Sequence, residues 1–310
     1  MKRSLFLPTL FVILAIVACN IQPATVTSQP AVPSKTPVAT PTLPSPAVLT
    51  VDMLRNAQYN LQGCTGTPQS FQLVNGSYAS STDTTSADYV SVSMGDQVAF
   101  GDLNFDGIED AAVILGVNCG GTGVFTWIAA VLNMDGTPSY AASVFIDDRP
   151  MISSLSITND EIISDLVIHG TADAMCCPSL KTQQGYRLYG STLVETRLAT
   201  WEAGGQERSI NITSPVDLAD VSYPFTVLGG VTVGPFENTL AYAIYTADNT
   251  LVTSGSVMTD SPDAGQPGNF SLPVDLTSAG VTGLVRIEFS EKSMADGSVM
   301  TLDSVLVNVH

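Results

Sequence analysis

Between residues 71 and 309 the sequence alternates apolar and polar residues in short runs, and turn-forming residues separate one run from the next. The side chains of a strand point alternately to its two faces, so a period of two predicts strands rather than helices. The pairs Asn75-Gly76, Asp106-Gly107 and Asp135-Gly136 favour the tight turns of antiparallel hairpins. The predicted strands are residues 71–74, 89–92, 97–100, 111–117, 124–132, 141–146, 152–157, 161–168, 186–188, 210–213, 223–228, 239–246, 251–257, 270–274, 284–290 and 301–309.

These strands form two groups, and the expected fold class is mainly β. Residues 48–200 predict an antiparallel β-rich domain. One short helix over residues 51–61 precedes its strands, since Met53, Leu54, Ala57 and Leu61 fall at helical spacing. Residues 208–310 contain seven short strands, which is typical of a β-sandwich.

The N-terminal segment predicts export and a lipid anchor. Lys2 and Arg3 precede an apolar run over residues 5–18, a pattern typical of a secretory signal and shorter than the ~20 residues that span a bilayer as a helix. The ending Val17-Ala18-Cys19 resembles the lipobox of bacterial lipoproteins. The resemblance implies that residues 1–18 are a signal peptide and that Cys19 carries acyl chains such as palmitate. The protein would then be extracytoplasmic and held to a bacterial membrane; the alternative is a secreted protein with an unmodified Cys19.

Residues 19–47 are expected to form a Pro/Thr/Ser-rich stalk. Seven prolines lie among Thr, Ser, Ala and Val, and Lys35 is the only charged residue of this segment. Such a composition buries too little apolar surface to fold, and proline favours the extended polyproline II conformation. We expect the segment to space the folded part away from the membrane.

The charge balance excludes nucleic acid as a partner. The chain has 11 Lys and Arg residues against 29 Asp and Glu residues, a net charge of −18. No basic stripe is available to neutralise phosphates. The expected partners are the membrane, reached through Cys19, and an unknown envelope protein or glycan.

One acidic loop has the spacing of a calcium site. Oxygen-bearing residues stand at relative positions 1, 3, 5, 7 and 9, and Gly107 at position 6 permits a backbone reversal. The loop resembles those of dockerins and FG-GAP repeats, although position 12 is Val113 rather than a bidentate Glu. The alternative is an acidic turn whose side chains bond local backbone. The predicted calcium ligands are Asp102, Asn104, Asp106, the carbonyl of Ile108, and Asp110.

Besides Cys19 the chain has four cysteines, Cys64, Cys119, Cys176 and Cys177. Outside the cytoplasm an even number predicts two disulfides, and three pairings are open. Cross-pairing is the less strained option, whereas a Cys176–Cys177 bond would be strained and would suit a redox switch. His169 precedes the Cys176–Cys177 loop, but its spacing matches no standard zinc finger, and we expect a histidine at a strand end or on the surface.

The C-terminal residues resemble a known family of domains. The landmarks are Ile212-Thr213-Ser214-Pro215, Val227-Leu228-Gly229, Gly234-Pro235-Phe236-Glu237, Gly268-Asn269-Phe270-Ser271, Val285-Arg286-Ile287-Glu288 and Ala295-Asp296-Gly297-Ser298. In this order they resemble the bacterial spore-germination immunoglobulin-like domain. The resemblance implies an extracytoplasmic sandwich that mediates contacts and brings no catalytic residues.

No catalytic constellation is evident in the sequence. The chain lacks a G-x-S-x-G nucleophile elbow, a phosphate-binding glycine loop and a pair of metal-binding histidines. We therefore expect a protein that is not an enzyme, with no catalytic residues, and that acts as a binding or scaffolding module. The alternative is an envelope hydrolase or thiol-redox factor that uses residues 48–200.

Overall fold

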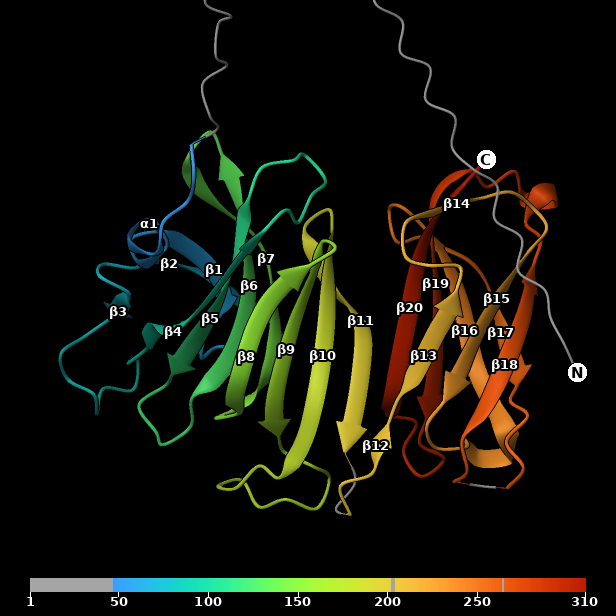
Figure 1. Ribbon diagram of the computed structural model, residues 1–310. Helices are drawn as coiled ribbons and strands as arrows, with labels where there is room; N and C mark the ends of the chain where they lie inside the picture. The colour runs from blue at the N-terminus through green and yellow to red at the C-terminus, as the bar shows by residue number, and fades with distance from the viewer. Residues whose placement is uncertain (1–46, 202–203, 264) are drawn as a thin grey trace, which may run out of the picture. The chain divides into compact units, whose positions relative to one another are not determined.

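The computed structural model describes residues 47–201, 204–263 and 265–310, and these residues belong to one compact unit. The predicted signal peptide, Cys19 and all but the last residue of the predicted stalk lie outside the described residues. The fold is mainly β, as the sequence predicts (Figure 1). Its elements are α1 (Val51–Arg55), β1 (Gln58–Gln62), β2 (Pro68–Gln72), β3 (Ser77–Ala79), β4 (Ser91–Gly101), β5 (Asp110–Asn118), β6 (Phe125–Met134), β7 (Thr137–Asp148), β8 (Met151–Thr158), β9 (Glu161–Ile168), β10 (Leu180–Tyr189), β11 (Thr192–Trp201), β12 (Glu207–Arg208), β13 (Ile210–Ser214), β14 (Ala219–Val221), β15 (Phe225–Val231), η1 (Phe236–Asn238), β16 (Thr239–Thr246), β17 (Leu251–Met258), β18 (Gly268–Val274), η2 (Thr277–Ala279), β19 (Gly283–Lys292) and β20 (Val299–Val309).

A five-stranded antiparallel sheet, in the order β3-β4-β5-β6-β7, forms the centre of the N-terminal part. One of its faces packs on α1 and the β1–β2 hairpin through a core that includes Leu54, Tyr59 and Phe71. A second core, which includes Ile128 of β6 and Ile162 of β9, joins β4–β7 to β8–β11. Because it is covered on both sides, β5 is apolar along nearly its whole length rather than alternating.

The C-terminal part is a sandwich of two sheets. Strands β13, β15 and β18 form the smaller sheet, and β14, β16, β17, β19 and β20 belong to the larger one. The core between them includes Phe270, Ile287 and Phe289, and the Phe270 and Phe289 ring centroids are 4.5 Å apart. The alternating burial of β15 and β18 explains why the period-two pattern predicted these strands.

The larger sheet continues from the sandwich into the N-terminal part. Its strand order is β17-β16-β19-β20-β11-β10-β9-β8, with β12 and β14 paired to β11 and β20. The joining pair is β11 with β20, where Arg197 lies opposite Asp303 and Leu198 opposite Leu302. The sequence suggests a domain boundary between residues 200 and 208. In the structure this boundary falls between β11 and β12, which pair with each other in the ten-stranded sheet.

Two local predictions need correction. The helix predicted over residues 51–61 ends at Arg55, and Tyr59 and Leu61 lie on β1, where they alternate with exposed residues. Thr50 caps the short helix by accepting a hydrogen bond from the Met53 N–H. Strand β11 was not predicted, because a bulge opposite Gly185 and Tyr186 interrupts its alternation.

Candidate functional site

The calcium-type loop lies between β4 and β5, and its first carboxylate is surrounded by backbone N–H groups. Asp102 accepts hydrogen bonds from the backbone N–H groups of Asn104 (3.1 Å), Asp106 (3.3 Å) and Gly107 (2.7 Å). Asp106 accepts one from the Ile108 N–H at 2.8 Å. Gly107 has φ +80°, the left-handed conformation that the reversal requires. The loop is therefore ordered by its own acidic side chains.

The fifth predicted ligand has a different environment. Asp110 is fully buried at the start of β5, and its two carboxylate oxygens accept hydrogen bonds from the Leu103 N–H (2.9 Å) and the Asn133 N–H (2.8 Å). Burial raises the pKa of the Asp110 carboxyl, and nearby Asp106 and Asp102 also raise it. Asp110 thus joins the loop to the β6–β7 hairpin. Among the described residues, no group of three or more His, Cys, Asp and Glu side chains is arranged to hold a metal ion.

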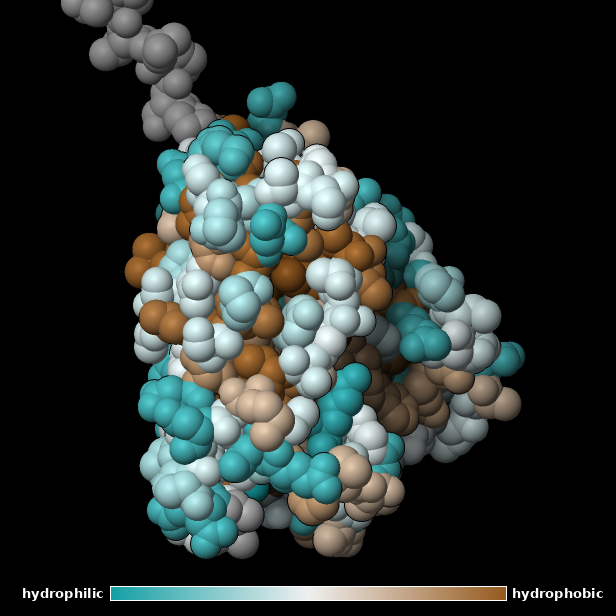
Figure 2. Space-filling view, turned by 90° about the vertical axis from the view of Figure 1, so that its right-hand side faces the viewer, coloured by the Kyte–Doolittle hydropathy of each residue, from teal (hydrophilic) through white to brown (hydrophobic). Residues whose placement is uncertain are grey.

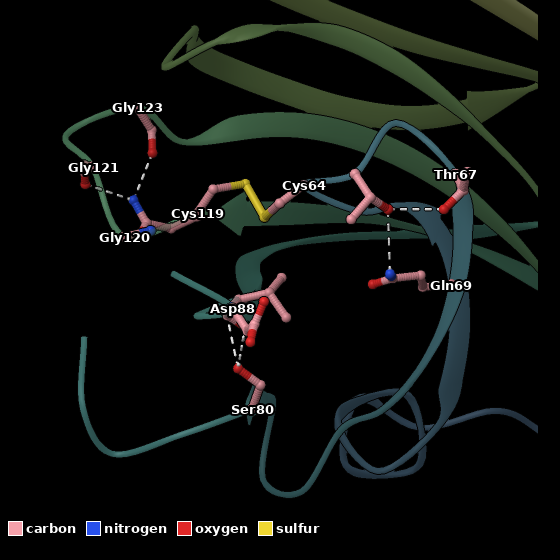
Figure 3. Close-up of a disulfide and its surroundings, with 12 residues drawn as sticks. Cys64, Thr67, Gln69, Ser80, Asp88, Cys119, Gly120, Gly121 and Gly123 are labelled. Carbon is pink, nitrogen blue, oxygen red and sulfur yellow. Dashed lines mark hydrogen bonds between the residues drawn. A yellow bond between two sulfur atoms is a disulfide. The ribbon is translucent and has the colours of Figure 1, made fainter. Parts of the chain in front are cut away.

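The structure pairs Cys64 with Cys119, with Cα atoms 5.7 Å apart. As Figure 3 shows, this disulfide joins the tip of the β1–β2 hairpin to the glycine-rich loop after β5. The Asn118 side-chain amide donates to the carbonyls of Gly121 and Gly123 and so orders that loop. The disulfide therefore fixes the hairpin to the end of β5, the central strand of the five-stranded sheet.

A groove of about 350 Å³ lies beside this disulfide. Its rings are Phe125 and Phe145, which are 40% and 46% exposed, and Trp127, whose ring centroid is 5.3 Å from that of Phe145. The lining residues are Gln62, Gly63, Cys64, Gly66, Val117, Cys119, Phe125, Trp127 and Phe145. None of these lining side chains is acidic or basic, because the two cysteines are joined in a disulfide. The groove therefore suits the binding of an uncharged group. Sequence spacing gives no signal for this groove, because its rings come from β6 and β7 and the rest of its lining comes from the end of β5 and the tip of the β1–β2 hairpin.

The remaining cysteines, Cys176 and Cys177, are joined to each other in the loop between β9 and β10, and both are exposed. His169, just after β9, contacts Asp147 rather than a sulfur: its Nδ1 lies 2.8 Å from Asp147 Oδ2. This hydrogen bond raises the pKa of the His169 imidazole. The Arg149 guanidinium holds the loop by donating to the Met175 carbonyl at 2.6 Å.

A cavity of about 300 Å³ lies where β11 meets β20, and ionic side chains surround it. Arg197 lies 3.6 Å from Glu161 and 3.5 Å from Asp303, while Arg187 pairs with Asp217. Burial raises the pKa of Asp303 to about 6, although Arg197 and the Ile212 N–H oppose the shift. Arg197 faces two of these three carboxylates and Arg187 the third, an arrangement that joins the two parts of the chain. Sequence spacing gave no signal for this cluster.

A second buried cation lies on β19. Arg286 is only 2% exposed; it pairs with Glu288 and donates to Asn249 Oδ1 at 2.7 Å. Its guanidinium carbon lies 4.2 Å from the ring centroid of Tyr245 and 5.5 Å from that of Tyr189. Because Tyr189 belongs to β10, Arg286 connects the sandwich with the N-terminal part of the chain.

The fold and these sites together define a class: a β protein whose C-terminal part is an immunoglobulin-like sandwich. Residues 209–298 match the family model of the immunoglobulin-like domain of bacterial spore germination. The match covers strands β13 to β19 and confirms the resemblance predicted from the sequence. A search of curated proteins finds no match to the chain. Within the described residues, no helix has the length and apolar character needed to cross a membrane.

Proposed function

We propose that this protein is a lipid-anchored bacterial envelope protein that acts as a non-catalytic binding or scaffolding module at the cell surface. The observation that carries the proposal is the match of residues 209–298 to an immunoglobulin-like domain. Such sandwiches present surfaces for contact on a rigid scaffold. The groove beside Cys64–Cys119 supports the same function, because it is open, aromatic and uncharged.

The anchor is the part of the proposal that rests on the sequence. Lys2, Arg3 and the apolar run before Cys19 have the order of a lipoprotein signal. Two or more acyl chains on Cys19 would hold the protein stably at a membrane, whereas a single chain gives marginal binding. Attraction to anionic lipid would contribute little, since the chain carries a net charge of −18.

One fractionation and capture experiment tests the anchor and the binding function together. The full chain, expressed in a bacterial envelope, is expected in the membrane fraction, and a Cys19→Ser variant in the soluble fraction. After detergent extraction, the protein is expected to retain an envelope protein or glycan that saturates with increasing extract. Substitution of Phe145 by alanine should reduce that retention, while the same change at exposed Phe236, outside the groove, should not. An unchanged membrane fraction for Cys19→Ser would contradict the anchor, and no enrichment over an unrelated acidic protein would contradict the binding function.

We also propose that calcium occupies the loop of residues 102–110. A site of this kind outside the cytoplasm has a Kd of about 10⁻⁴–10⁻³ M. Calcium at ten to a hundred times that Kd is expected to raise the free energy of unfolding by about 1.4–2.7 kcal/mol. Thermal unfolding of Ser45–His310 in calcium and in chelator measures the effect. Asp106→Asn should abolish it, and Asp135→Asn, in the turn after β6, should not. Equal melting temperatures in calcium and in chelator would contradict the calcium site and favour the alternative, an acidic turn whose side chains bond only local backbone.

A second candidate function, thiol–disulfide exchange, is favoured by one observation, the exposure of Cys176 and Cys177. A dithiol would pass two electrons to this S–S bond, giving two protein thiols and the disulfide of the reductant. Under this alternative, mild dithiol treatment followed by thiol labelling should modify Cys176 and Cys177 before Cys64 and Cys119. Labelling of both pairs at the same rate would argue against it.

A further inference from the structure

Strand β17 forms one end of the ten-stranded sheet and is an open edge of the sandwich. Within the described residues it pairs only with β16, and no other backbone hydrogen bond is made by Leu251–Met258. Its terminal side chains Leu251 and Met258 are 52% and 62% exposed. Figure 2 looks onto the side of the protein where β17 and β18 lie, and white to brown surfaces of uncharged residues cover much of its middle. The outward N–H and C=O groups of β17 are thus free to pair with another strand.

The neighbouring edges are blocked in ways that β17 is not. At the other end of the sheet, the Gln97 side chain donates to the Ile152 carbonyl of β8 at 3.0 Å. In the smaller sheet, the Asn269 N–H of β18 donates to the Asp260 carboxylate, and Pro273 of that strand has no N–H to offer. Proline, charge and covering side chains are the usual protections of edge strands, and β17 contains none of them.

The sequence of β17 is compatible with antiparallel pairing between two copies of this strand. It reads Leu-Val-Thr-Ser-Gly-Ser-Val-Met, and antiparallel pairing with a second copy about Gly255 would place Ser254 opposite Ser256. The same register places Val252 opposite Met258. Most of an acidic surface repels another copy, but this eight-residue edge has no charge, so no like-charged pair would form across it. For the same reason the edge has no carboxylate to attract a basic partner.

We propose that β17 is a dimerisation edge, where two copies of this chain join antiparallel about Gly255 and extend the sheet across both molecules. This two-fold contact is isologous, because each copy offers the same strand. Main-chain hydrogen bonds supply the attraction, as they do wherever a strand is added to a sheet edge. The pairing would give a surface protein two sandwiches and two aromatic grooves in one assembly.

Sedimentation of Ser45–His310 over about a hundredfold range of concentration tests the proposal, and the wild-type chain is expected to change from monomer to dimer. Substituting exposed Ser254 and Ser256 by lysine would bring four positive charges together at the two-fold axis. We expect this variant to weaken the dimer at least about tenfold. Amide hydrogen exchange should show protection that rises with concentration in Leu251–Met258.

A matched control carries the same added charge elsewhere. Thr226→Lys/Ser271→Lys places two lysines on exposed positions of β15 and β18, and this variant should dimerise like the wild type. A wild-type chain that stays monomeric throughout would overturn the proposal. So would a dimer that resists the β17 lysines, or one whose concentration-dependent protection lies in another strand.

Discussion

Replacing Arg286 by alanine is expected to lower the free energy of unfolding by about 3–5 kcal/mol, the usual cost of removing one partner of a buried ion pair. The substitution leaves Glu288 without its cation and removes the guanidinium that contacts the rings of Tyr189 and Tyr245. It also leaves Asn249 without its donor. Urea unfolding, followed by the fluorescence of Trp127 and Trp201, measures the change through the midpoint and the slope of the transition.

Two further variants distinguish the effect of breaking a buried ion pair from the effect of removing any arginine side chain. Arg55→Ala removes an arginine whose side chain is 40% exposed and lies 3.3 Å from a fully exposed Asp96, and it should change the midpoint little. Arg286→Met/Glu288→Leu removes both charges and keeps their volume, and it should recover most of the stability lost in Arg286→Ala. The interpretation fails if Arg286→Ala behaves like Arg55→Ala, or if the double variant is no more stable than the single one.

The period-two pattern detects strands in which one face is buried and the other is exposed to solvent. In β15 and β18 the buried residues recur at every second position, and the predicted strands lie within three residues of the observed limits. In β11 the pattern fails because a bulge inserts one residue and moves the following side chains to the opposite face. Ala57, just before β1, and Leu61 on β1 stand four residues apart and imitate a helix, although β1 pairs with β2 through Tyr59 and Phe71. Local pattern therefore predicts fold class better than it predicts irregular strands.

The sequence likewise predicts sites made of neighbouring residues better than sites made of residues that are distant in the chain. The loop of residues 102–110 was recognisable because its ligand-type residues are consecutive in the sequence. Arg286 alternates with buried Val285 and Ile287, so its pattern predicts an outward, solvated side chain. The structure covers it with Tyr189, almost a hundred positions earlier in the chain. The Cys64–Cys119 pairing likewise depends on a hairpin tip meeting a distant loop, which spacing alone left open.

Glu195→Gln is expected to stabilise the protein at alkaline pH. Burial, with the Glu288 carboxylate adding to it, raises the pKa of Glu195 from 4.5 to about 7. Between these values the folded state binds more protons than the unfolded state, so the free energy of unfolding falls as pH rises from about 4.5 to 7 and then levels off. Glutamine carries no charge at any of these pH values. At pH 8 the variant should be more stable than the wild type by about 3 kcal/mol, and near pH 4 the two should be similar.

Urea unfolding between pH 4 and pH 8 measures this difference. The shape of the curve of unfolding free energy against pH shows which carboxyl group is responsible. A residual slope between about pH 4 and 6 should persist in Glu195→Gln, because the raised pKa of Asp303 acts in the same direction. Asp303→Asn is a less clean variant, since Asp303 accepts the Ile212 N–H and faces Arg197. Glu207→Gln, at an exposed position of β12, removes one carboxylate without relieving a buried charge, and it should follow the wild-type curve. A Glu195→Gln curve that parallels the wild type from pH 4 to pH 8 would mean that Glu195 is solvated and ionised like a surface carboxylate, and that Glu195 and Glu288 are both charged in the folded protein at neutral pH.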